Sequence, residues 1–247
     1  MRGGRRALVT GGSRGIGRAI AAALIGAGYE VVILARDGAA VDRAVADRAA
    51  SAGRAVDVTD SAALAAAIAD TGPFDLLVNN AGGAHTAPFA KTDLDTFRRL
   101  YSLNVESAVA ASQACLPAMI AAKRGRIVNI ASTAGLKGFG YVSAYVAAKH
   151  ALVGLTRAVA LELAKTGVTV NAVCPGYTDT DLVAEGVRTI VAKTGRSEDD
   201  ARAHFTASNP MGRLIAPEEV ADAVLWLAGD GAAAVTGQAI VVAGGEL

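Results

Sequence analysis

Short runs of β-branched and other apolar residues alternate along this chain with longer stretches rich in alanine and leucine. The short runs have the length of strands and the long ones that of helices, so the pattern predicts about seven strands separated by helices. Several predicted strands are apolar throughout, which indicates a sheet covered by helices on both faces. Helical crossovers join parallel strands, so we expect an α/β fold with a doubly wound, mostly parallel sheet. The predicted strands are RALVT, EVVILA, RAVDV, FDLLVNN, RIVNIAS, GVTVNAV and QAIVVAG.

Nothing in this alternation divides the chain into parts. The sequence has no internal repeat and no low-complexity linker, so residues 1–247 are expected to form a single domain. The least regular stretch covers residues 181–210, where charged residues mix with small and apolar ones after the sixth predicted strand. A segment of this length at the carboxyl end of a strand is well placed to be a substrate lid. The alternative is an extra pair of surface helices.

The composition predicts a large buried core and gives no sign of a charged partner. Of the 247 residues 52% are hydrophobic, and the formal net charge is +1. Scattered charges give no reason to expect nucleic acid or an anionic membrane as a partner. The sequence shows no charge-free apolar run of about 18 residues and no apolar segment of signal-peptide type, so we expect a cytoplasmic protein. Cys115 and Cys174 lack metal-ligand spacing and are expected to be buried free thiols, and no metal site is predicted.

The stretch ALVTGGSRGIGRAI begins as a strand and ends as a helix, with Gly11, Gly15 and Gly17 at the turn. Glycine leaves no Cβ between backbone and ligand, and the start of the helix offers free N–H groups to a phosphate. The spacing is Gly-x-x-x-Gly-x-Gly, which differs from the common Gly-x-Gly-x-x-Gly fingerprint. Taken alone, the loop is equally compatible with a phosphate site and a tight structural turn.

The end of the second predicted strand indicates which nicotinamide cofactor the fold would take. An acidic residue there would bind the ribose 2′-hydroxyl of NAD, whereas the 2′-phosphate of NADP needs a cation. The strand ends in Ala35, Arg36 and Asp37, and Arg14 of the glycine loop is expected to reach the same place. Two guanidinium groups suit a phosphate dianion. NADP(H) is therefore favoured over NAD(H), and Asp37 is the residue that supports the alternative.

The stretch SAYVAAKH places Tyr145 and Lys149 four residues apart. On a helix this spacing puts both side chains on one face, about 5–6 Å apart at Cβ. A phenol with a pKa of about 10 is a poor base near neutral pH unless a positive neighbour favours the phenolate. The pair is therefore either a surface pair or a proton-transfer centre.

Six motifs, taken together, distinguish these alternatives. They are TGGSRGIG from Thr10, NNAG at 79–82, Asn104 in SLNVES, Ser132 at the end of NIAS, YVAAK at 145–149 and PGYTDT at 175–180. In these motifs and in their order the sequence resembles the short-chain dehydrogenase/reductase family over nearly its whole length. The resemblance implies a single-domain Rossmann-type fold and an NAD(P)-dependent oxidoreductase.

The resemblance implies a catalytic tetrad of Asn104, Ser132, Tyr145 and Lys149. Tyr145 would donate a proton to a carbonyl oxygen during reduction, or accept one from an alcohol during oxidation. Lys149 would favour the phenolate and hold the nicotinamide ribose, and Ser132 would hydrogen-bond the substrate oxygen. Asn104 would fix the water chain through which the lysine exchanges protons. The hydride itself would come from the cofactor.

The resemblance also implies a set of cofactor contacts. Asp57 would accept a hydrogen bond from the adenine amino group, and the segment after the sixth strand would hold the nicotinamide carboxamide. Asn79 is expected to stabilise the sheet instead. The residues expected to bind the cofactor are Gly11, Ser13, Arg14, Gly15, Ile16, Gly17, Arg36, Asp57, Val58, Asn80, Ala81, Gly82, Tyr145, Lys149, Pro175, Gly176, Thr178 and Thr180.

Within the family, the stretches GRIVNIAS, NPMGRL and PEEVADAVLWLAG resemble 3-oxoacyl reductases that act on acyl-carrier-protein or coenzyme A thioesters. Reductases that use the carrier protein meet this acidic partner with basic residues near the site entrance. Lys123 and Arg124 are candidates for that role, whereas Thr166 stands where such reductases tend to be basic. We therefore expect NADPH-dependent reduction of a 3-oxoacyl thioester, with the carrier left open. The alternatives are another ketone or secondary alcohol (sugar, steroid or aromatic) and a non-catalytic nucleotide-binding protein.

The resemblance further implies a homotetramer, formed through the helices after the fourth and fifth strands and through the C-terminal edge. Ala243 replaces an acidic residue that many relatives have in this edge. His85, just after NNAGG, is either a substrate contact or a plain loop residue.

Overall fold

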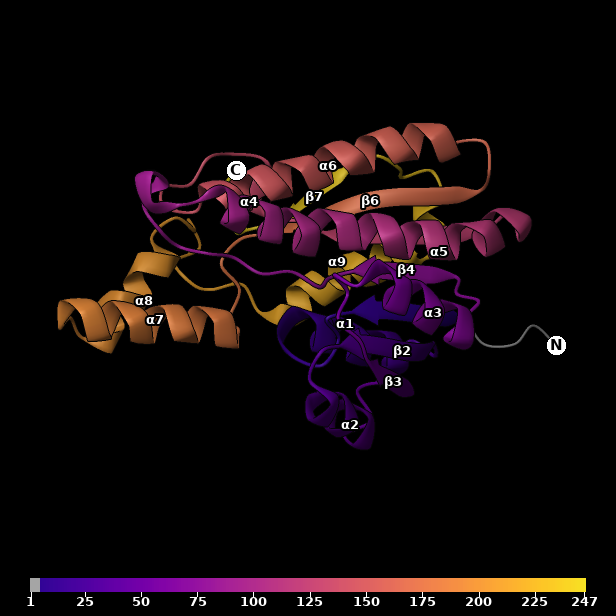
Figure 1. The fold of residues 1–247 in the computed structure, drawn as a ribbon, viewed down its shortest axis with the longest axis horizontal. Coiled ribbons are helices and arrows are strands. Elements are labelled where there is room, and N and C mark those ends of the chain that lie inside the picture. The colour runs from indigo at the N-terminus through magenta and orange to yellow at the C-terminus, as the bar shows by residue number, and fades with distance from the viewer. Residues whose placement is uncertain (1–4) are drawn as a thin grey trace.

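The computed structural model describes residues 5–247, and its central feature is one sheet of seven parallel strands (Figure 1). The strands lie in the order β3-β2-β1-β4-β5-β6-β7, which is a doubly wound arrangement. Both the α/β class and the seven predicted strands are confirmed. The strand bounds are β1 Arg6–Thr10, β2 Glu30–Ala35, β3 Ala52–Ala55, β4 Leu76–Asn79, β5 Gly125–Ile130, β6 Val168–Pro175 and β7 Ala239–Val242.

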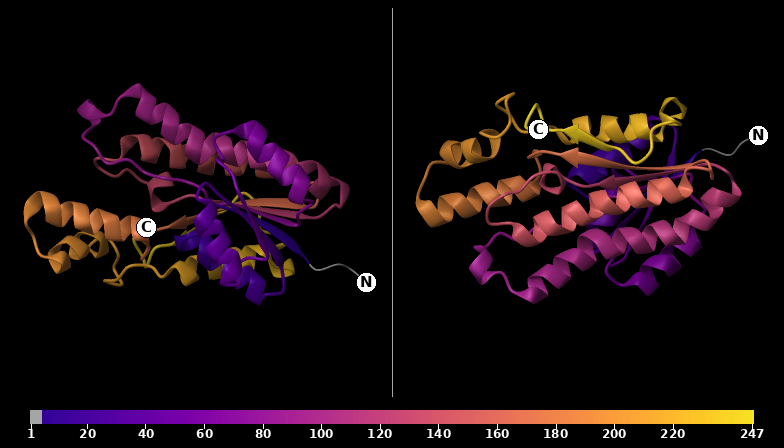
Figure 2. Two further views of the ribbon diagram at one scale, coloured as in Figure 1. Left: turned by 60° about the horizontal axis from the view of Figure 1, so that its bottom comes forward. Right: turned by 90° about the horizontal axis from the view of Figure 1, so that it is seen from above.

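Helices cover both faces of this sheet (Figure 2). On one face α1 packs against α9, with α2 beside the outer strands; on the other, α3 packs against α5 and α4 against α6. This double cover buries every residue of β5 and β6, which explains why the predicted strands are apolar throughout. The helix bounds are α1 Gly15–Gly26, α2 Gly38–Ala46, α3 Ser61–Thr71, α4 Leu94–Tyr101, α5 Ser107–Ala121, α6 Ser143–Leu163, α7 Asp181–Thr194, α8 Glu198–Thr206 and α9 Pro217–Ala228.

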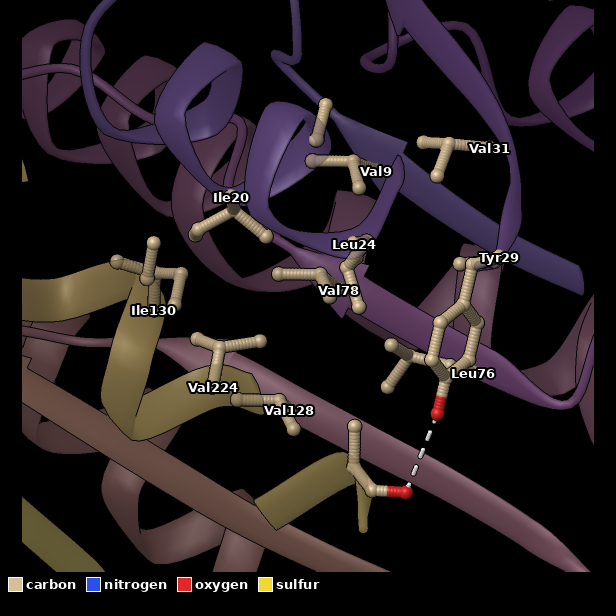
Figure 3. Packing of buried hydrophobic residues seen from close by; sticks show 14 of the residues in the cluster. Val9, Ile20, Leu24, Tyr29, Val31, Leu76, Val78, Val128, Ile130 and Val224 are labelled. Atoms are coloured by element: carbon tan, nitrogen blue, oxygen red, sulfur yellow. Dashed lines mark hydrogen bonds between the residues drawn. The ribbon is translucent and has the colours of Figure 1, made fainter. Parts of the chain in front are cut away.

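The core between the sheet and the α1–α9 pair is built from branched aliphatic side chains. Leu24 and Val224 come from the two helices and pack over Val9 and Val78 of the central strands (Figure 3). Tyr29 is the polar exception, and its hydroxyl donates a hydrogen bond to the Ala228 carbonyl oxygen at 3.4 Å. The middle of the sheet is therefore a rigid base for the loops at its ends.

One strand differs from its prediction. The pattern placed the third strand at RAVDV, but β3 covers Ala52–Ala55, so Asp57 and Val58 lie beyond its end. The parallel register pairs β3 with residues 32–35 of β2, and the Val56 N–H makes one more bond, to the Ala35 carbonyl oxygen. The Asp57 carboxylate then accepts a hydrogen bond from the Thr59 N–H at 3.0 Å, and this local turn ends the strand.

Residues 181–210 contain the helix pair α7 and α8, which projects beyond the carboxyl edge of the sheet (Figures 1 and 2). Gly195 follows α7 in the left-handed conformation, with φ of 68°, and allows the chain to turn back. Val187, Ala201 and Leu214 form a small apolar cluster of their own between the two helices and the chain that follows them. The expected helices are present, and the lid role of this pair stays a prediction.

Both cysteines are free and buried, as predicted. Burial raises the pKa of Cys115 to about 12 and that of Cys174 to about 11, so neither thiol is a reactive thiolate near neutral pH. Among the helices of residues 5–247, none combines the length and the apolar character needed to cross a bilayer.

Candidate active site

The predicted site residues gather at the carboxyl edge of the sheet. The strand order reverses direction between β1 and β4, because the chain first builds outward to β3 and then returns to the other side of β1. Loops after adjacent strands diverge at such a reversal and leave a crevice where doubly wound proteins bind ligands. The glycine loop follows β1 and the NNAG segment follows β4, so the two loops border this crevice together.

The glycine loop is held closely against the NNAG segment. Gly11 has a φ of 65°, and its N–H donates to the Leu34 carbonyl oxygen at 2.7 Å. The Asn80 side-chain amide donates to the carbonyl oxygens of Thr10 and Gly11, at 3.0 and 3.1 Å. Any Cβ on Gly17 would meet the Gly11 oxygen and the Asn80 amide. Close packing alone therefore requires glycine at position 17.

The start of α1 is open to an anion. Arg14 occupies the N-cap position and its side chain makes no capping hydrogen bond. The backbone N–H groups of Gly15, Ile16 and Gly17 then have no intrahelical acceptor, and they follow Ser13 in the turn. This end of the helix can hold a phosphate, since its free N–H groups and its dipole both favour negative charge.

The two arginines near the second strand are free of internal partners. Arg14 and Arg36 are both exposed, and neither forms an ion pair with any carboxylate of residues 5–247. The Asp37 carboxylate is turned away to cap α2, where it accepts a hydrogen bond from the Ala40 N–H at 3.1 Å. The acidic residue that supported NAD is thus already engaged by the backbone.

Asp57 and Val58 lie in the turn between β3 and α3. Hydrogen bonds from the Thr59 backbone N–H and hydroxyl lower the pKa of Asp57 below its usual value. Val58 is buried. The carboxylate is therefore ionised at neutral pH and retains acceptor positions for a ligand's amino group.

Asn104 lies in a π-helical turn, Ser102–Glu106, between α4 and α5. Its side-chain amide donates to the carbonyl oxygens of Leu100 and Gly83 at 2.9 and 3.0 Å, while its Oδ1 faces the Gly83 N–H at 3.3 Å. In the wider π-helical turn some backbone carbonyl oxygens accept no hydrogen bond from the N–H four residues on. Such turns are frequent at functional sites. Asn104 is 1% exposed and joins the α4–α5 segment to the loop after β4.

Ser132, Tyr145 and Lys149 converge from β5 and α6. Tyr145 and Lys149 are one turn apart on α6, with the Lys149 Nζ 5.6 Å from the centroid of the Tyr145 ring. Ser132 follows the end of β5, and its hydroxyl is close enough to hydrogen-bond the phenol. Lys149 Nζ donates to the Ile130 carbonyl oxygen at 2.8 Å. The predicted spacing thus produces one cluster.

Burial opposes charge on both members of the helical pair. It raises the pKa of Tyr145, and the Ser132 hydrogen bond lowers it by a smaller amount. It also lowers the pKa of Lys149 from 10.5 to about 8. Since an ammonium and a phenolate favour each other at close range, the pair can pass a proton near neutral pH, which neither group does well alone.

Gly82 separates two members of the tetrad. A Cβ on Gly82 would lie 2.7 Å from the Asn104 Oδ1 and 3.5 Å from the Lys149 Nζ. The amide oxygen and the ammonium therefore border the same small space, over a backbone that has no side chain there. This is the space in which a water molecule would connect Asn104 with Lys149. Ala81, the residue before Gly82, donates its N–H to the Thr10 hydroxyl at 3.1 Å.

The segment after β6 reaches the glycine loop. Pro175 ends the strand, and the Gly176 N–H donates to the Val242 carbonyl oxygen at 3.0 Å. Thr178 is buried and its hydroxyl donates to the Gly176 carbonyl oxygen at 3.0 Å. Thr180 begins α7, and its methyl group would lie 3.4 Å from a Cβ on Gly15. All the predicted cofactor residues therefore lie along one edge of the sheet.

Asn79 has the structural role that its sequence position suggested. Its side-chain amide donates to the Asn129 Oδ1 at 2.9 Å, and the Asn129 amide donates to the Thr156 hydroxyl at 2.8 Å. This buried chain of hydrogen bonds joins β4 to β5 and α6, beneath the site.

Sequence reasoning missed a partly buried ion pair beside the site. Lys137, in the loop between Ser132 and Tyr145, lies with its Nζ 3.1 Å from the Glu246 Oε1, and the Glu246 side chain is only 2% exposed. Glu246 also packs against Gly176, at 2.9 Å from the position of a Cβ there. The pair therefore connects the loops after β5 and β6 through the C-terminal segment. No local pattern predicts it, because both residues stand in glycine-rich stretches.

A row of aromatic rings was missed as well. The Phe139 ring lies edge-on to Tyr177 at 6.4 Å between centroids, and Tyr177 lies edge-on to Phe205 of α8 at 5.1 Å. Gly186 of α7 leaves room for this row, since a Cβ there would be 2.8 Å from Phe205. The row connects the loop before Tyr145 with the helix pair. Tyr177 stands inside the PGYTDT motif, which is the one sequence signal that could have indicated it.

One expectation about the site entrance is wrong. Lys123 and Arg124 precede β5, and the residues before parallel strands lie at the amino edge, opposite the site. Arg124 is 3.6 Å from Asp230 at that edge. Neither residue lies at the entrance of the site on its own chain, so their position there gives no support for a carrier protein.

Comparisons with known proteins agree with this geometry. A family model for short chain dehydrogenases matches residues 5–190. The chain belongs to this family of oxidoreductases, which act between CH–OH and C=O groups with a nicotinamide cofactor. The open helix start, the close-packed glycines and the unpaired arginines described above fit such a cofactor.

Individual relatives cover nearly the whole chain. It is 41% identical to a putative ketoacyl reductase of granaticin polyketide synthase from Streptomyces violaceoruber, over 97% of this chain and 92% of the relative. It is 37% identical to 2-keto-3-deoxy-L-fuconate dehydrogenase from Xanthomonas campestris, over 98% and 80%. A solved structure of a variant actinorhodin polyketide ketoreductase with NADPH matches at a TM-score of 0.91 and 39% identity, covering 98% of this chain and 97% of that one. The chain thus resembles the ketoacyl reductases.

Proposed function

We propose that this protein is an NADPH-dependent ketoreductase that converts a 3-oxoacyl thioester into the 3-hydroxyacyl form. The observation that carries the proposal is the cluster of Ser132, Tyr145 and Lys149 beside Asn104, next to a glycine loop with an open helix start. The cluster can supply one proton to an oxygen, and it lies at the same sheet edge as the glycine loop. A ketone reduction needs both parts at once.

In the proposed reaction Ser132 and Tyr145 hold the substrate carbonyl oxygen with two hydrogen bonds. A nicotinamide cofactor, held by the glycine loop and the segment after β6, would supply the hydride. Tyr145 donates its proton to the oxygen as negative charge develops there, and Lys149 favours the phenolate left behind. Lys149 then gives a proton to the Tyr145 phenolate, and Asn104 would position a water that reprotonates Lys149 from solvent. Lys149 is only 4% exposed, so bulk water has little access to the lysine end of this path.

A preference for NADPH over NADH is supported by the charges at the end of β2. Arg14 and Arg36 are exposed and form no ion pair with a carboxylate of the described residues, whereas Asp37 caps α2. A 2′-phosphate would find two guanidinium groups there, and a 2′-hydroxyl would find no free acidic acceptor.

The substrate class is supported by the putative ketoacyl reductase among the relatives. The dehydrogenase of 2-keto-3-deoxy-L-fuconate, at 37% identity, supports a second candidate, the oxidation or reduction of a small polar alcohol or ketone. The aromatic row of Phe139, Tyr177 and Phe205 favours the first candidate, because apolar rings beside the site suit an acyl chain better than a sugar acid. We propose that α7 and α8 act as the lid over this chain. The carrier, whether coenzyme A or acyl carrier protein, stays open.

We also propose a homotetramer, formed through the outer face of α4, α5 and α6 and through the edge strand β7. Tyr101 is 45% exposed beside a hollow that Ala144 and Ala147 also line. Leu161 is 81% exposed on α6, and Trp226 is 50% exposed on α9. Large apolar side chains left in water at several places are typical of protein–protein contacts. A cytoplasmic location agrees with two free thiols.

The proposal is tested by following NADPH absorbance with a panel of carbonyl compounds. The panel contains 3-oxoacyl coenzyme A, 3-oxoacyl carrier protein, an aromatic ketone and a 2-keto sugar acid. We expect the highest kcat/KM with a 3-oxoacyl thioester, and a loss of about 10²–10⁴-fold in the Tyr145→Phe variant.

Tyr29→Phe is the matched control, because it removes a phenol hydroxyl that donates only to the Ala228 carbonyl oxygen in the core. It should leave kcat/KM unchanged. A higher kcat/KM with the sugar acid would select the second candidate, and equal rates for Tyr145→Phe and the wild type would refute the catalytic role of the cluster.

A further inference from the structure

Glu246 carries a carboxylate that is buried with little compensation. Its side chain is 2% exposed, and Lys137 is its ion-pair partner, with the Nζ 3.1 Å from Oε1. Among residues 5–247 no donor reaches Oε1 with the geometry of a hydrogen bond. Taking a carboxylate out of water is costly, and one cation whose side chain is 34% exposed offsets only part of that cost. Stability alone therefore does not explain why the chain buries this group.

The carboxylate faces the segment that follows β6. A Cβ on Gly176 would lie 2.9 Å from the Glu246 Oε2, so the glycine leaves the room that the carboxylate occupies. Burial raises the pKa of the next residue, Tyr177, and the charge of Glu246 raises it further. Glu246 therefore lies against the start of residues 175–180, the segment that would hold the nicotinamide.

Lys137 belongs to the turn that begins at Ser132. Its backbone N–H donates to the Thr133 carbonyl oxygen at 3.0 Å, and Thr133 directly follows Ser132. Its Nζ donates to the Glu246 carbonyl oxygen at 3.3 Å and lies 5.1 Å from the centroid of the Phe139 ring. The ion pair thus joins the Ser132 turn to the segment after β6.

The backbone before Glu246 also defines where its side chain lies. Gly244 and Gly245 both have a positive φ, 61° and 91°, which glycine adopts without strain. The Glu246 N–H then donates to the Ala243 carbonyl oxygen at 3.2 Å and closes a tight turn after β7. The carboxylate is therefore placed beside Gly176 by its own backbone as well as by the lysine.

We propose that Glu246 is a positioning residue for the nicotinamide end of the cofactor. Its carboxylate, held by Lys137, fixes the start of residues 175–180 relative to Ser132. A buried ion pair contributes little net stability, but it can define the geometry of the groups around it. The adenine end, which would bind at the glycine loop, does not depend on the pair. The inference rests on the proposed function for the place of the nicotinamide, but not for the identity of the ketone.

The test compares the binding of NADPH with that of 2′-phospho-ADP-ribose, which lacks the nicotinamide, by calorimetry. In Glu246→Gln, which keeps the size of the side chain and removes its charge, the Kd of NADPH should rise about fivefold, as for the loss of one hydrogen bond. The Kd of 2′-phospho-ADP-ribose should stay at its wild-type value. With the best ketone of the panel, kcat should fall about 10–100-fold, because the hydride donor is misplaced.

The matched control is Glu30→Gln, which breaks the pair of Glu30 with Arg6 at the amino edge, 2.9 Å long. It should change neither Kd. Equal weakening of both ligands in Glu246→Gln would show a merely structural role and overturn the inference, as would an unchanged Kd for NADPH.

The lysine gives a second way to test the pair. Lys137→Met leaves the Glu246 carboxylate without its cation and should also weaken NADPH alone, whereas Lys137→Arg keeps the charge and should bind both ligands as the wild type does. Because the two residues act as one unit, the double variant Lys137→Met with Glu246→Gln should lose no more than the worse single variant. Losses that add in the double variant would contradict the proposal.

Failure of the proposed cofactor contacts gives a different result. Thr180→Val removes the hydroxyl that would hold the carboxamide, and it should weaken NADPH but not 2′-phospho-ADP-ribose. If Glu246→Gln has this effect and Thr180→Val does not, the contact of Thr180 fails and the role of Glu246 is supported. The reverse result overturns the role of Glu246 alone. Should the wild type prefer NADH, the same comparison is made with NADH and ADP-ribose and decides the inference in the same way.

Discussion

The two edges of the sheet carry positive charge in opposite ways. At the amino edge Arg5, Arg6 and Arg124 each have a carboxylate partner. Arg5 and Arg124 lie 2.6 and 3.6 Å from Asp230, and Arg6 lies 2.9 Å from Glu30. These pairs are partly exposed, so each contributes little to stability, about 0–1 kcal/mol. Three arginines at the amino edge thus share two carboxylates of the chain itself.

At the carboxyl edge the cations around the glycine loop lack such partners. Lys149 is 4% exposed and donates to the Ile130 carbonyl oxygen. Arg14 and Arg36 are in no ion pair within residues 5–247. Burying an unpaired ammonium costs stability, and a chain that keeps one at a crevice has a functional reason to do so. The unpaired cations at the carboxyl edge are therefore available to a ligand, whereas those at the amino edge are not.

The largest loss of activity is expected from a substitution that fills the space between Asn104 and Lys149. In Gly82→Ala the new Cβ would lie 2.7 Å from the Asn104 Oδ1, which must move. We expect kcat/KM to fall about 100-fold, since a shift of about 1 Å in a positioned group has effects of this size. The measurement is steady-state kinetics at saturating NADPH.

The matched control is Gly26→Ala in the last turn of α1, away from the proposed subunit contacts, where a Cβ meets no atom within 4 Å. This change should leave the kinetics unchanged and stabilise the helix by about 1 kcal/mol. Full activity in Gly82→Ala would show that the small space beside Lys149 has no role.

A smaller effect should appear in the stability of the chain against pH. Burial lowers the pKa of Lys149 from 10.5 to about 8. Below pH 8 the folded chain carries a buried ammonium, a cost of about 3 kcal/mol at 1.36 kcal/mol per pKa unit. Between pH 8 and 10.5 only the unfolded chain binds that proton, so the contribution of Lys149 to the free energy of unfolding rises with pH across this window.

Lys149→Met should remove this rise and stabilise the protein at pH 7 by about 1–3 kcal/mol, because it replaces a buried charge with an apolar side chain. Urea denaturation at several pH values measures both effects. Lys165→Met, at an exposed position, should leave the profile unchanged. Parallel profiles for wild type and Lys149→Met would contradict the account of this lysine.

Much of the fold could be predicted from the sequence, because doubly wound sheets bury whole strands and leave continuous apolar runs. The β-branched runs EVVILA and GVTVNAV, for example, predicted the bounds of β2 and β6 to within two residues. The strand predicted at RAVDV lies too far along the chain, because β3 ends before the turn in which the Asp57 carboxylate accepts a hydrogen bond from the Thr59 N–H. The pairing of β3 with β2 and the turn at Asp57 set that boundary, and the hydrophobic pattern of the sequence shows neither.

The site residues also fall into a group that could be predicted from the sequence and a group that could not. The tetrad could be predicted because its members stand in motifs at fixed spacing, and the structure brings them together. The Lys137–Glu246 pair could not, since 109 residues separate its members and glycine-rich stretches surround both. Lys123 and Arg124 were assigned to the wrong edge of the sheet because a basic cluster alone does not indicate the edge at which it lies. Their position just before a parallel strand does indicate the amino edge.

The most direct test of the central claim is to titrate the purified protein with NADPH and with NADH by calorimetry and compare the two Kd values. If Arg14 and Arg36 are held for a 2′-phosphate, the wild type binds NADPH about 10–100-fold more tightly, the worth of a charge-assisted hydrogen bond. Arg36→Ala should reduce this ratio by about tenfold, while Arg6→Ala, which breaks a pair at the amino edge, should leave it unchanged. Tighter binding of NADH by the wild type, or an equal ratio in Arg36→Ala, would contradict the account.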